Sequence, residues 1–204
     1  MYYPKVFKIE DEAELFGFIE QWSFADLITT NDGELFVNHV PFVFDRSQKK
    51  LYGHLAVNNP QLAFLEKADD LTVVFKGANT YISPSWYISQ DMVPTWNFEA
   101  VHVSGKARLV DDTGLITILE KLTEKYEEPF ENRWKMDKVS KSKLEIMLKM
   151  IVGFEIEIIS INGKSKLSQN RSREDQLGVI AGLRNQNNSM SLSVADKMEL
   201  NIKN

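Results

Sequence analysis

Polar side chains that could bind an anion lie where a predicted strand meets a predicted helix. His54 lies in the strand Leu51 to Leu55, and Asn58-Asn59-Pro60 follows within a few residues. Asn59 is a suitable helix cap and Pro60 suits the first helical position, so free backbone amides are expected beside these side chains. A helix start attracts phosphate because its unpaired N–H groups and its dipole favour negative charge. An ordinary strand-to-helix turn would use the same residues and stays open as an alternative.

A histidine close to a proline marks a second candidate, in the run Asn38-His39-Val40-Pro41. Proline cannot donate to a strand ladder, so this strand is expected to lie at a sheet edge or to be bulged there. Bulges often lie beside functional sites, but His39 could equally be a structural residue bonded to a backbone carbonyl.

Aromatic residues are concentrated around one short loop. It is bracketed by Tyr81-Ile82-Ser83-Pro84-Ser85-Trp86-Tyr87 and Val93-Pro94-Thr95-Trp96-Asn97, which together carry two tryptophans, two tyrosines and several hydroxyl or amide groups. A flat, amphipathic aromatic ligand would suit such a lining. The alternative is that the tryptophans simply close one end of a barrel. The stretch from His39 to Asn97 is therefore the predicted ligand-holding part of the chain.

Composition narrows the classes of function that the chain can have. The sequence of 204 residues has 24 basic and 29 acidic side chains, a net charge of -5, so the chain as a whole is not a polyanion-binding surface. The run Lys164, Lys166, Arg171 and Arg173 is identified as the local basic cluster, with a solvated turn as its alternative. The absence of cysteine excludes thiol nucleophiles, disulfides and cysteine-ligated metals.

Metal binding and membrane insertion are not predicted. The three histidines, His39, His54 and His102, lack the spacing of a metal site and have no accompanying acidic motif. The N-terminus lacks the pattern of a signal peptide, and no apolar segment is long enough to span a membrane, so a cytoplasmic location without membrane association is expected.

The elements that must position these residues are mostly strands. Hydrophobic periodicity predicts strands over 25–30, 34–44, 51–55, 71–76, 97–110 and 152–161, with turns at Asn31-Asp32-Gly33 and Asn162-Gly163. Amphipathic helices are predicted from Asp11 and over 60–67, 112–126 and 140–151. This pattern favours a mainly β fold, a small β-barrel with flanking helices, over residues 1–184. Residues 185–204 are expected to form a weakly anchored C-terminal tail or a short appended helix.

Several ordered blocks of the sequence closely resemble the FMN-binding negative transcriptional regulators of PaiB type. The resemblance runs from Tyr3 to about Leu183. It is carried by His39-Val40-Pro41, Gly53-His54-Leu55-Ala56, Asn58-Asn59-Pro60-Gln61, the two aromatic segments, Val101-His102-Val103 with Gly105, and Lys166-Leu167-Ser168-Gln169-Asn170.

The resemblance implies an FMN-binding split barrel, usually a homodimer with FMN at the subunit interface. It places the phosphate of FMN near His54, Ala56, Asn58, Asn59 and Gln61, with His39 and Pro41 on the adjoining strand. Thr95, Trp96 and Asn97 would face the ring or a substrate, and Trp86 would share the aromatic lining with Trp96. Lys166, Ser168, Gln169 and Asn170 would contribute donors to the phosphate or the ribityl chain.

Three functions follow from this reading. The first is a flavin-dependent dimeric sensor that represses transcription, through direct contact with DNA or through another regulator; no helix-turn-helix is evident. The second is a flavin-dependent oxidoreductase of the flavin reductase or pyridoxamine-phosphate oxidase kind, in which the cofactor supplies the chemistry. The third is a haem-binding relative of the same barrel with a histidine as axial ligand.

Overall fold

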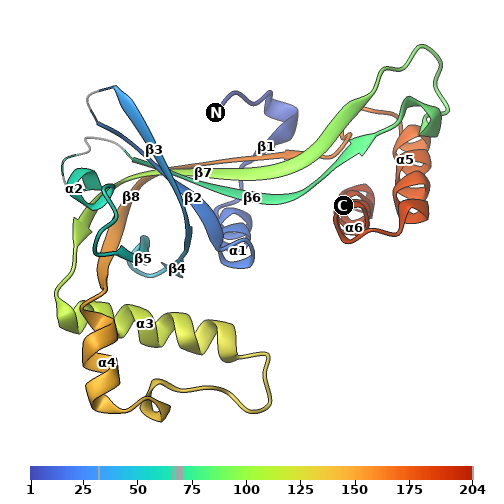
Figure 1. The fold of residues 1–204 in the computed structure, drawn as a ribbon. Helices are drawn as coiled ribbons and strands as arrows, with labels where there is room; N and C mark the ends of the chain where they lie inside the picture. Colours follow the sequence, from blue (N-terminus) through green and yellow to red (C-terminus); the bar gives the residue numbers. More distant parts are fainter. Residues whose placement is uncertain (32, 66, 68–70, 204) are drawn as a thin grey trace. The chain divides into compact units, whose positions relative to one another are not determined.

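The computed structural model describes residues 1–31, 33–65, 67 and 71–203 (Figure 1). The strands are β1 (Lys8–Ile9), β2 (Phe24–Asn31), β3 (Glu34–Pro41), β4 (Val43–Asp45), β5 (Lys50–Ala56), β6 (Leu71–Ile82), β7 (Thr95–Leu109) and β8 (Ile151–Lys166). The α-helices are α1 (Glu12–Gln21), α2 (Leu62–Leu65), α3 (Asp112–Glu127), α4 (Lys141–Leu148), α5 (Arg173–Gln186) and α6 (Ser189–Lys203). Short 3₁₀ helices are η1 (Lys5–Phe7), η2 (Pro84–Trp86) and η3 (Met136–Lys138).

The strands form a mostly antiparallel sheet that closes on itself. The strand order is β3-β2-β6-β7-β8-β5-β4, and β1 pairs with β8. β3 and β4 stand at opposite ends of this order, yet only Phe42 separates them in the sequence. The Phe42 ring is fully buried, with its centroid 5.9 Å from that of Phe75 and 6.1 Å from that of Phe154. The predicted β-barrel with flanking helices is confirmed.

Contacts divide the chain into two compact units. Unit 1 comprises residues 1–18, 76–101 and 162–204, and unit 2 comprises residues 19–75 and 102–161. The long strands β6, β7 and β8 contribute residues to both units. Unit 2 holds the barrel core together with α3 and α4, whereas unit 1 holds α5 and α6. The predicted boundary at residue 184 stays a prediction.

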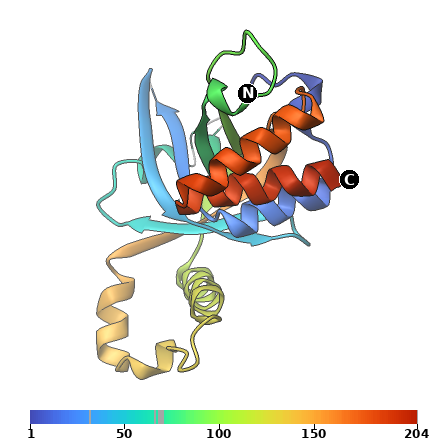
Figure 2. The same cartoon turned by 90° about the vertical axis from the view of Figure 1, so that its right-hand side faces the viewer.

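The C-terminal residues form a packed helix within unit 1. Figure 2 shows α5 and α6 side by side, and the two helices are joined at Asn187, which adopts a left-handed conformation with φ 50°. Val194, Ala195 and Met198 of α6 are fully buried. The sequence allowed a tail or a helix over 185–204, and residues 189–203 are helical; Asn204 lies outside the described residues.

The turn predicted at Asn162-Gly163 is wrong, because β8 continues through both residues to Lys166. Gly163 pairs with Ile9 of β1. A Cβ atom at Gly163 would lie 2.3 Å from Cδ2 of Leu15, so glycine is needed here for a close approach of α1. An Asn-Gly pair is a strong turn signal, but this glycine serves packing instead.

Other boundaries differ in smaller ways. The hairpin of β2 and β3 is confirmed, with Gly33 at φ 83°, although Asp32 of its predicted turn lies outside the described residues. The described part of the helix predicted over 60–67 is α2, and the helix predicted over 140–151 ends at Leu148. Among the described residues, no helix combines the length and the apolar character needed to cross a membrane.

Candidate functional site

The sequence-predicted site residues fall into two groups, one in each unit. The first group lies in unit 2 and consists of His39, Pro41, His54, Ala56, Asn58, Asn59 and Gln61. The second group lies in unit 1 and consists of Trp86, Thr95, Trp96, Asn97, Lys166, Ser168, Gln169 and Asn170.

Gln61 of the first group is a buried structural residue. Its Nε2 donates to the carbonyl oxygen of Leu27 and to Oγ1 of Thr29, both at 3.1 Å, and its Oε1 accepts from Nδ2 of Asn38 at 2.7 Å. These bonds attach the start of α2 to the hairpin of β2 and β3. The side chain of Gln61 therefore has little capacity left for a ligand.

Replacing Gln61 by methionine is expected to lower the free energy of unfolding by about 1–3 kcal/mol, because its buried partners on β2 and β3 lose their hydrogen bonds. Urea denaturation followed by circular dichroism measures the change. The exposed Gln90 provides a control, since Gln90→Met should alter stability by less than about 0.5 kcal/mol. Equal stabilities of the two variants would contradict the assigned role.

The turn after β5 caps itself and exposes its other residues. Oδ1 of Asn59 accepts from the backbone N–H of Gln61 at 2.9 Å, which confirms Asn59 as a cap. The described part of the helix that follows, α2, is four residues long. Ala56 and Asn58 are exposed. The side chains of this turn that reach the surface are therefore a methyl group, from Ala56, and an amide, from Asn58.

His39 and Pro41 lie on an exposed apolar face of the β2–β3 hairpin. β3 stands at one end of the strand order, so the predicted edge position is confirmed. Nδ1 of His39 lies 2.6 Å from Oδ1 of Asp26, its partner on β2. The same face carries three exposed apolar side chains, Phe24 (65% exposed), Leu35 (64%) and Val37 (46%).

Most of the second group is engaged inside unit 1. Nδ2 of Asn97 donates to Oγ of Ser168 at 2.9 Å, and Ser168 holds a left-handed backbone with φ 64°. Gln169 bonds the backbone on both sides of Lys166, at Leu167 N and Ser165 O. These amide and hydroxyl side chains stabilise the bend after β8.

Trp86 packs against α5. Ideal Cβ atoms at Gly178 and Gly182 would meet the carbonyl oxygen and the indole ring of Trp86. The two glycines are four residues apart and so share one helix face, which receives the tryptophan. This packing gives Trp86 a structural role against a helix of unit 1.

Lys166 is a half-buried cation in electropositive surroundings. Its Nζ donates to Oγ1 of Thr95 at 2.5 Å and to the carbonyl oxygen of Trp96 at 2.9 Å. Among the residues that the structure describes, no carboxylate lies within ion-pair distance of Lys166. Burial and the nearby charges of Lys164 and Arg171 lower the pKa of Lys166. A bound anion would relieve this unfavourable environment.

Trp96, whose carbonyl oxygen accepts from Lys166, belongs to an exposed pair of aromatic residues. Trp96 is 53% exposed and Tyr81 is 43% exposed. Their ring centroids are 6.3 Å apart at an interplanar angle of 77°, an edge-to-face pair. Asn170, the last residue of the second group, is also exposed. Unit 1 thus combines a positive cluster with an accessible aromatic surface.

His54 lines an apolar cleft in unit 2. The cleft has a volume of about 470 Å³ and is bordered by β5, α3, η3 and α4. Its lining residues are His54, Leu119, Thr123, Trp134, Met136, Val139, Leu144, Met147, Leu148, Met150 and Ile151. Within the described ranges of the chain, Nδ1 of His54 is buried without a hydrogen-bond partner. Burial lowers the pKa of this imidazole.

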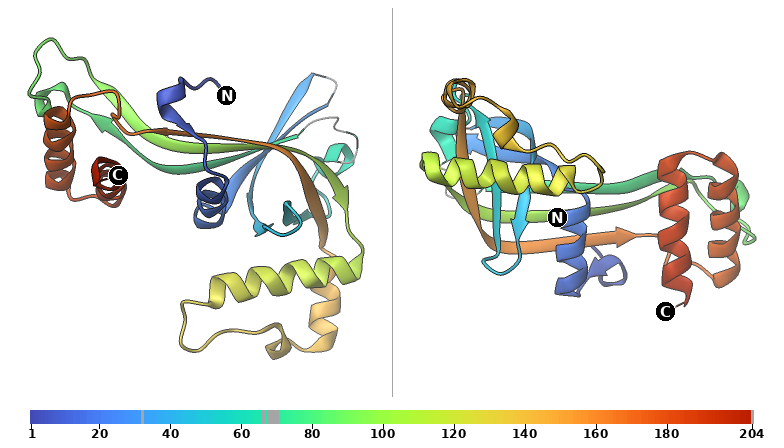
Figure 3. Two further views of the ribbon diagram at one scale, coloured as in Figure 1. Left: turned by 180° about the vertical axis from the view of Figure 1, so that it is seen from behind. Right: turned by 90° about the horizontal axis from the view of Figure 1, so that it is seen from below.

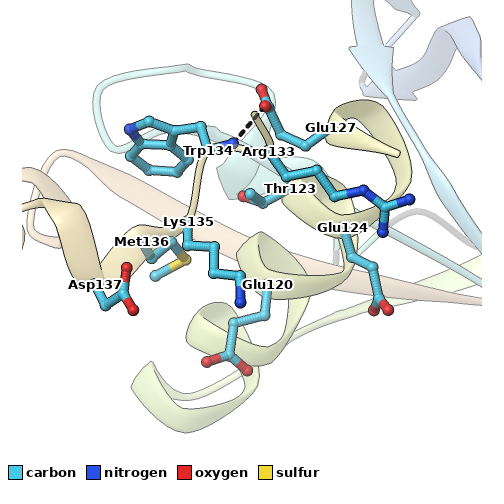
Figure 4. Close-up of a pocket in the computed structure, with 9 residues that line it drawn as sticks. All are labelled: Glu120, Thr123, Glu124, Glu127, Arg133, Trp134, Lys135, Met136 and Asp137. Atoms are coloured by element: carbon cyan, nitrogen blue, oxygen red, sulfur yellow. Dashed lines mark hydrogen bonds between the residues drawn. The ribbon is translucent and has the colours of Figure 1, made fainter. Parts of the chain in front are cut away.

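A charged pocket of about 450 Å³ adjoins the cleft (Figure 4). Thr123, Trp134 and Met136 line both spaces. Charged side chains of both signs, from Glu120, Glu124, Glu127, Arg133, Lys135 and Asp137, complete the pocket. The backbone N–H of Trp134 donates to Oε2 of Glu127 at 2.7 Å, and the indole ring points away from the guanidinium of Arg133.

A second basic segment was missed by the sequence reading. Residues 133–149 carry six basic and two acidic side chains, a net charge of +4 within a chain of net charge -5. The six basic residues, Arg133, Lys135, Lys138, Lys141, Lys143 and Lys149, are all exposed. Counting charges in a sliding window would have found the segment, which lies on η3, α4 and the residues around them.

The chain matches a family model, related proteins and solved structures. A family model described as "Putative FMN-binding domain" matches residues 1–160. The chain is 40% identical over 205 residues to the protease synthase and sporulation protein PAI 2 of Bacillus subtilis, covering 100% of this chain and 99% of that protein. It is 30% identical over 191 residues to an uncharacterised protein of Emericella nidulans, covering 72% and 74%.

Solved structures match the fold. The FAD- and haem-binding protein of Mycobacterium smegmatis gives a TM-score of 0.64 at 11% identity, covering 83% of this chain and 78% of that one. The flavocytochrome Anf3 of Azotobacter vinelandii gives a TM-score of 0.62 at 14% identity, covering 86% and 78%. The predicted split barrel is confirmed, and so is the resemblance to PaiB-type proteins. The chain belongs to the FMN-binding domain family, as a PaiB-type flavoprotein whose cofactor is FMN.

Proposed function

We propose that the protein is a dimeric, FMN-dependent repressor of transcription. The observation that carries the flavin part is Lys166, a half-buried lysine that lies near two other cations and donates to the carbonyl oxygen of Trp96, a member of an exposed aromatic pair. A phosphorylated aromatic ligand needs both features. The regulatory part is supported by the match over the whole chain to a sporulation protein.

The two groups of site residues differ in their chemistry toward FMN. The phosphate of FMN carries between one and two negative charges, as other phosphomonoesters do at neutral pH. The first group offers only amides, an alanine, a proline and imidazoles, which leave that charge uncompensated. Lys166 is the cation in the predicted set, and the exposed face of Trp96 suits the isoalloxazine ring. Bound FMN would supply a redox-active ring, and the protein would bind and orient it.

The proposed dimer interface is the outer face of β2 and β3. Phe24, Leu35 and Val37 expose apolar surface on the end strand β3 and its neighbour β2, an arrangement that monomeric proteins tend to avoid. His39 and Pro41 lie on the same face, so dimerisation there would bring two predicted ligand contacts to the interface.

Replacing Val37 by lysine is expected to convert the dimer into monomers, because two buried charges would face each other across a symmetric interface. Light scattering after size exclusion should give twice the 23.5 kDa chain mass for the wild type and a single chain mass for the variant. Ile159→Lys provides the control, since Ile159 is 58% exposed on β8 of the same unit. If Ile159→Lys were monomeric while Val37→Lys stayed dimeric, the interface would lie elsewhere.

The proposed contact with DNA is the basic segment 133–149. Exposed lysines that release counterions from phosphates give an affinity that falls steeply with salt. A mobility-shift assay on the protein's own promoter region, with and without FMN, tests this step. A sequence-specific complex that depends on FMN supports a flavin-dependent repressor. The alternative is an oxidoreductase. It would be established if no such complex formed and if NADH or NADPH bleached the bound flavin under anaerobic conditions.

A further inference from the structure

The apolar cleft around His54 has the dimensions and lining of a small-molecule site. Its volume of about 470 Å³ lies within the usual range of ligand pockets, which is about 300–1,000 Å³. Figure 3 shows α3 and α4, joined by the segment that contains η3, beside the strands of the barrel. α4 buries none of its side chains, and its half-buried Leu144 and Leu148 face the cleft.

His54 gives the cleft a specific polar group. Nδ1 of His54 is buried and has no hydrogen-bond partner among the described residues, whereas the imidazole as a whole keeps accessible surface and lines the cleft. The hydroxyl-bearing Thr123 is the second polar residue of the lining. Both side chains can bond a hydroxyl or carbonyl group of a ligand.

The chemistry of the lining limits what can bind. None of the cleft's lining residues is a lysine, arginine, aspartate or glutamate, and burial favours the neutral form of His54. A charged ligand would therefore lose its hydration without compensation. Trp134 and the thioethers of Met136, Met147 and Met150 favour contact with an aromatic ring.

We propose that this cleft binds an uncharged aromatic molecule that carries one hydroxyl or carbonyl group, bonded by His54. The uncharged lining of this cleft differs in chemistry from the FMN phosphate contact, which requires positive charge. His54 then contacts a second ligand and not the phosphate of FMN. Binding of this ligand can be measured whether or not the protein represses transcription.

The test measures binding of three naphthalene probes by isothermal titration calorimetry, using the full chain saturated with FMN. 2-Naphthol has the ring and the hydroxyl, naphthalene lacks the hydroxyl, and 2-naphthalenesulfonate carries a charge. We expect 2-naphthol to bind with one site per chain and at least tenfold more tightly than the sulfonate. His54→Phe should weaken 2-naphthol binding by about tenfold and leave naphthalene binding unchanged, because only a hydrogen bond is lost.

Two further variants separate this role from a loss of folding. His102→Phe changes the half-buried imidazole of β7, outside the cleft lining, and should leave all three affinities unchanged. Leu148→Trp should fill the cleft and abolish binding of both uncharged probes while the circular dichroism spectrum is retained. The proposal would be overturned if the wild type and His54→Phe bound 2-naphthol equally tightly. It would also be overturned if the wild type bound the sulfonate as tightly as 2-naphthol. Competition between FMN and 2-naphthol for one site would also overturn it, since the cleft would then be part of the flavin site.

Discussion

Replacing Lys166 by methionine is expected to weaken FMN binding by about tenfold to a hundredfold. A hydrogen bond to a charged group contributes about 1.5–3 kcal/mol, which corresponds to this range of affinity. Nζ of Lys166 already donates to Oγ1 of Thr95 and to the carbonyl oxygen of Trp96, so one of its three protons is left for a phosphate oxygen. Titration of the apoprotein with FMN, followed by quenching of flavin fluorescence, measures the dissociation constant.

Two variants show whether the charge of Lys166 is responsible. Lys166→Arg should retain most of the affinity because it preserves the charge, and Lys106→Met should retain all of it because Lys106 is an exposed residue of β7. The pKa of Lys166 is lowered by burial and by Lys164 and Arg171. As the pH rises, Lys166 should therefore lose its charge, and FMN affinity should decline, at a lower pH than that at which an ordinary lysine titrates. Lys166→Met should lack this alkaline decline. An affinity of Lys166→Met equal to that of the wild type would place the phosphate elsewhere.

The barrel could be predicted from the sequence because its strands obey local rules. The proline after His39 indicated an edge strand, and β3 occupies the end of the strand order. The closure of the sheet could not be predicted, since it depends on Phe42 joining β3 to β4 while each strand pairs with a different neighbour. Alternation of side chains describes a strand but does not identify its partner.

The roles of the individual side chains in the candidate site could not be predicted from the sequence. Polar and aromatic residue types cannot show whether a group faces a ligand or another part of the chain. Gln61 and Asn97 are both fully buried and hydrogen-bonded internally, whereas Trp96 and Lys166 keep accessible surface. His54 differs again, because its buried nitrogen has no partner in the described part of the chain. Only tertiary contacts show whether a polar side chain is bonded internally, accessible, or buried without a partner.

Trp86 and the second basic segment illustrate two different limits. The contact between Trp86 and α5 joins residues about ninety positions apart, so no local pattern could reveal it. The segment 133–149 was visible in the sequence, but its lysines are dispersed among apolar residues and the overall charge of the chain is negative. A net charge describes the whole chain and conceals a local surface of opposite sign.

Replacing Gly182 by alanine is expected to destabilise the protein by about 1–3 kcal/mol, although the same change inside an ordinary helix stabilises it by about 1 kcal/mol. The reason is the contact with Trp86: a Cβ atom at Gly182 would lie 2.4 Å from Cδ2 and 2.5 Å from Cγ of the indole. The ring is bulky and cannot yield as the end of a flexible side chain could. Urea denaturation gives the size and the sign of the change.

A matched position and a double variant attribute this effect to the tryptophan. Ala181 is exposed on the same helix, so Ala181→Gly should cost about 1 kcal/mol and show that ordinary helix propensity operates in α5. In a Trp86→Leu background, Gly182→Ala should lose its destabilising effect and become neutral or stabilising, a coupling that requires the two residues to be in contact. If Gly182→Ala stabilised the wild type, Trp86 would not be held by α5, and its indole would again be available to face a bound ring.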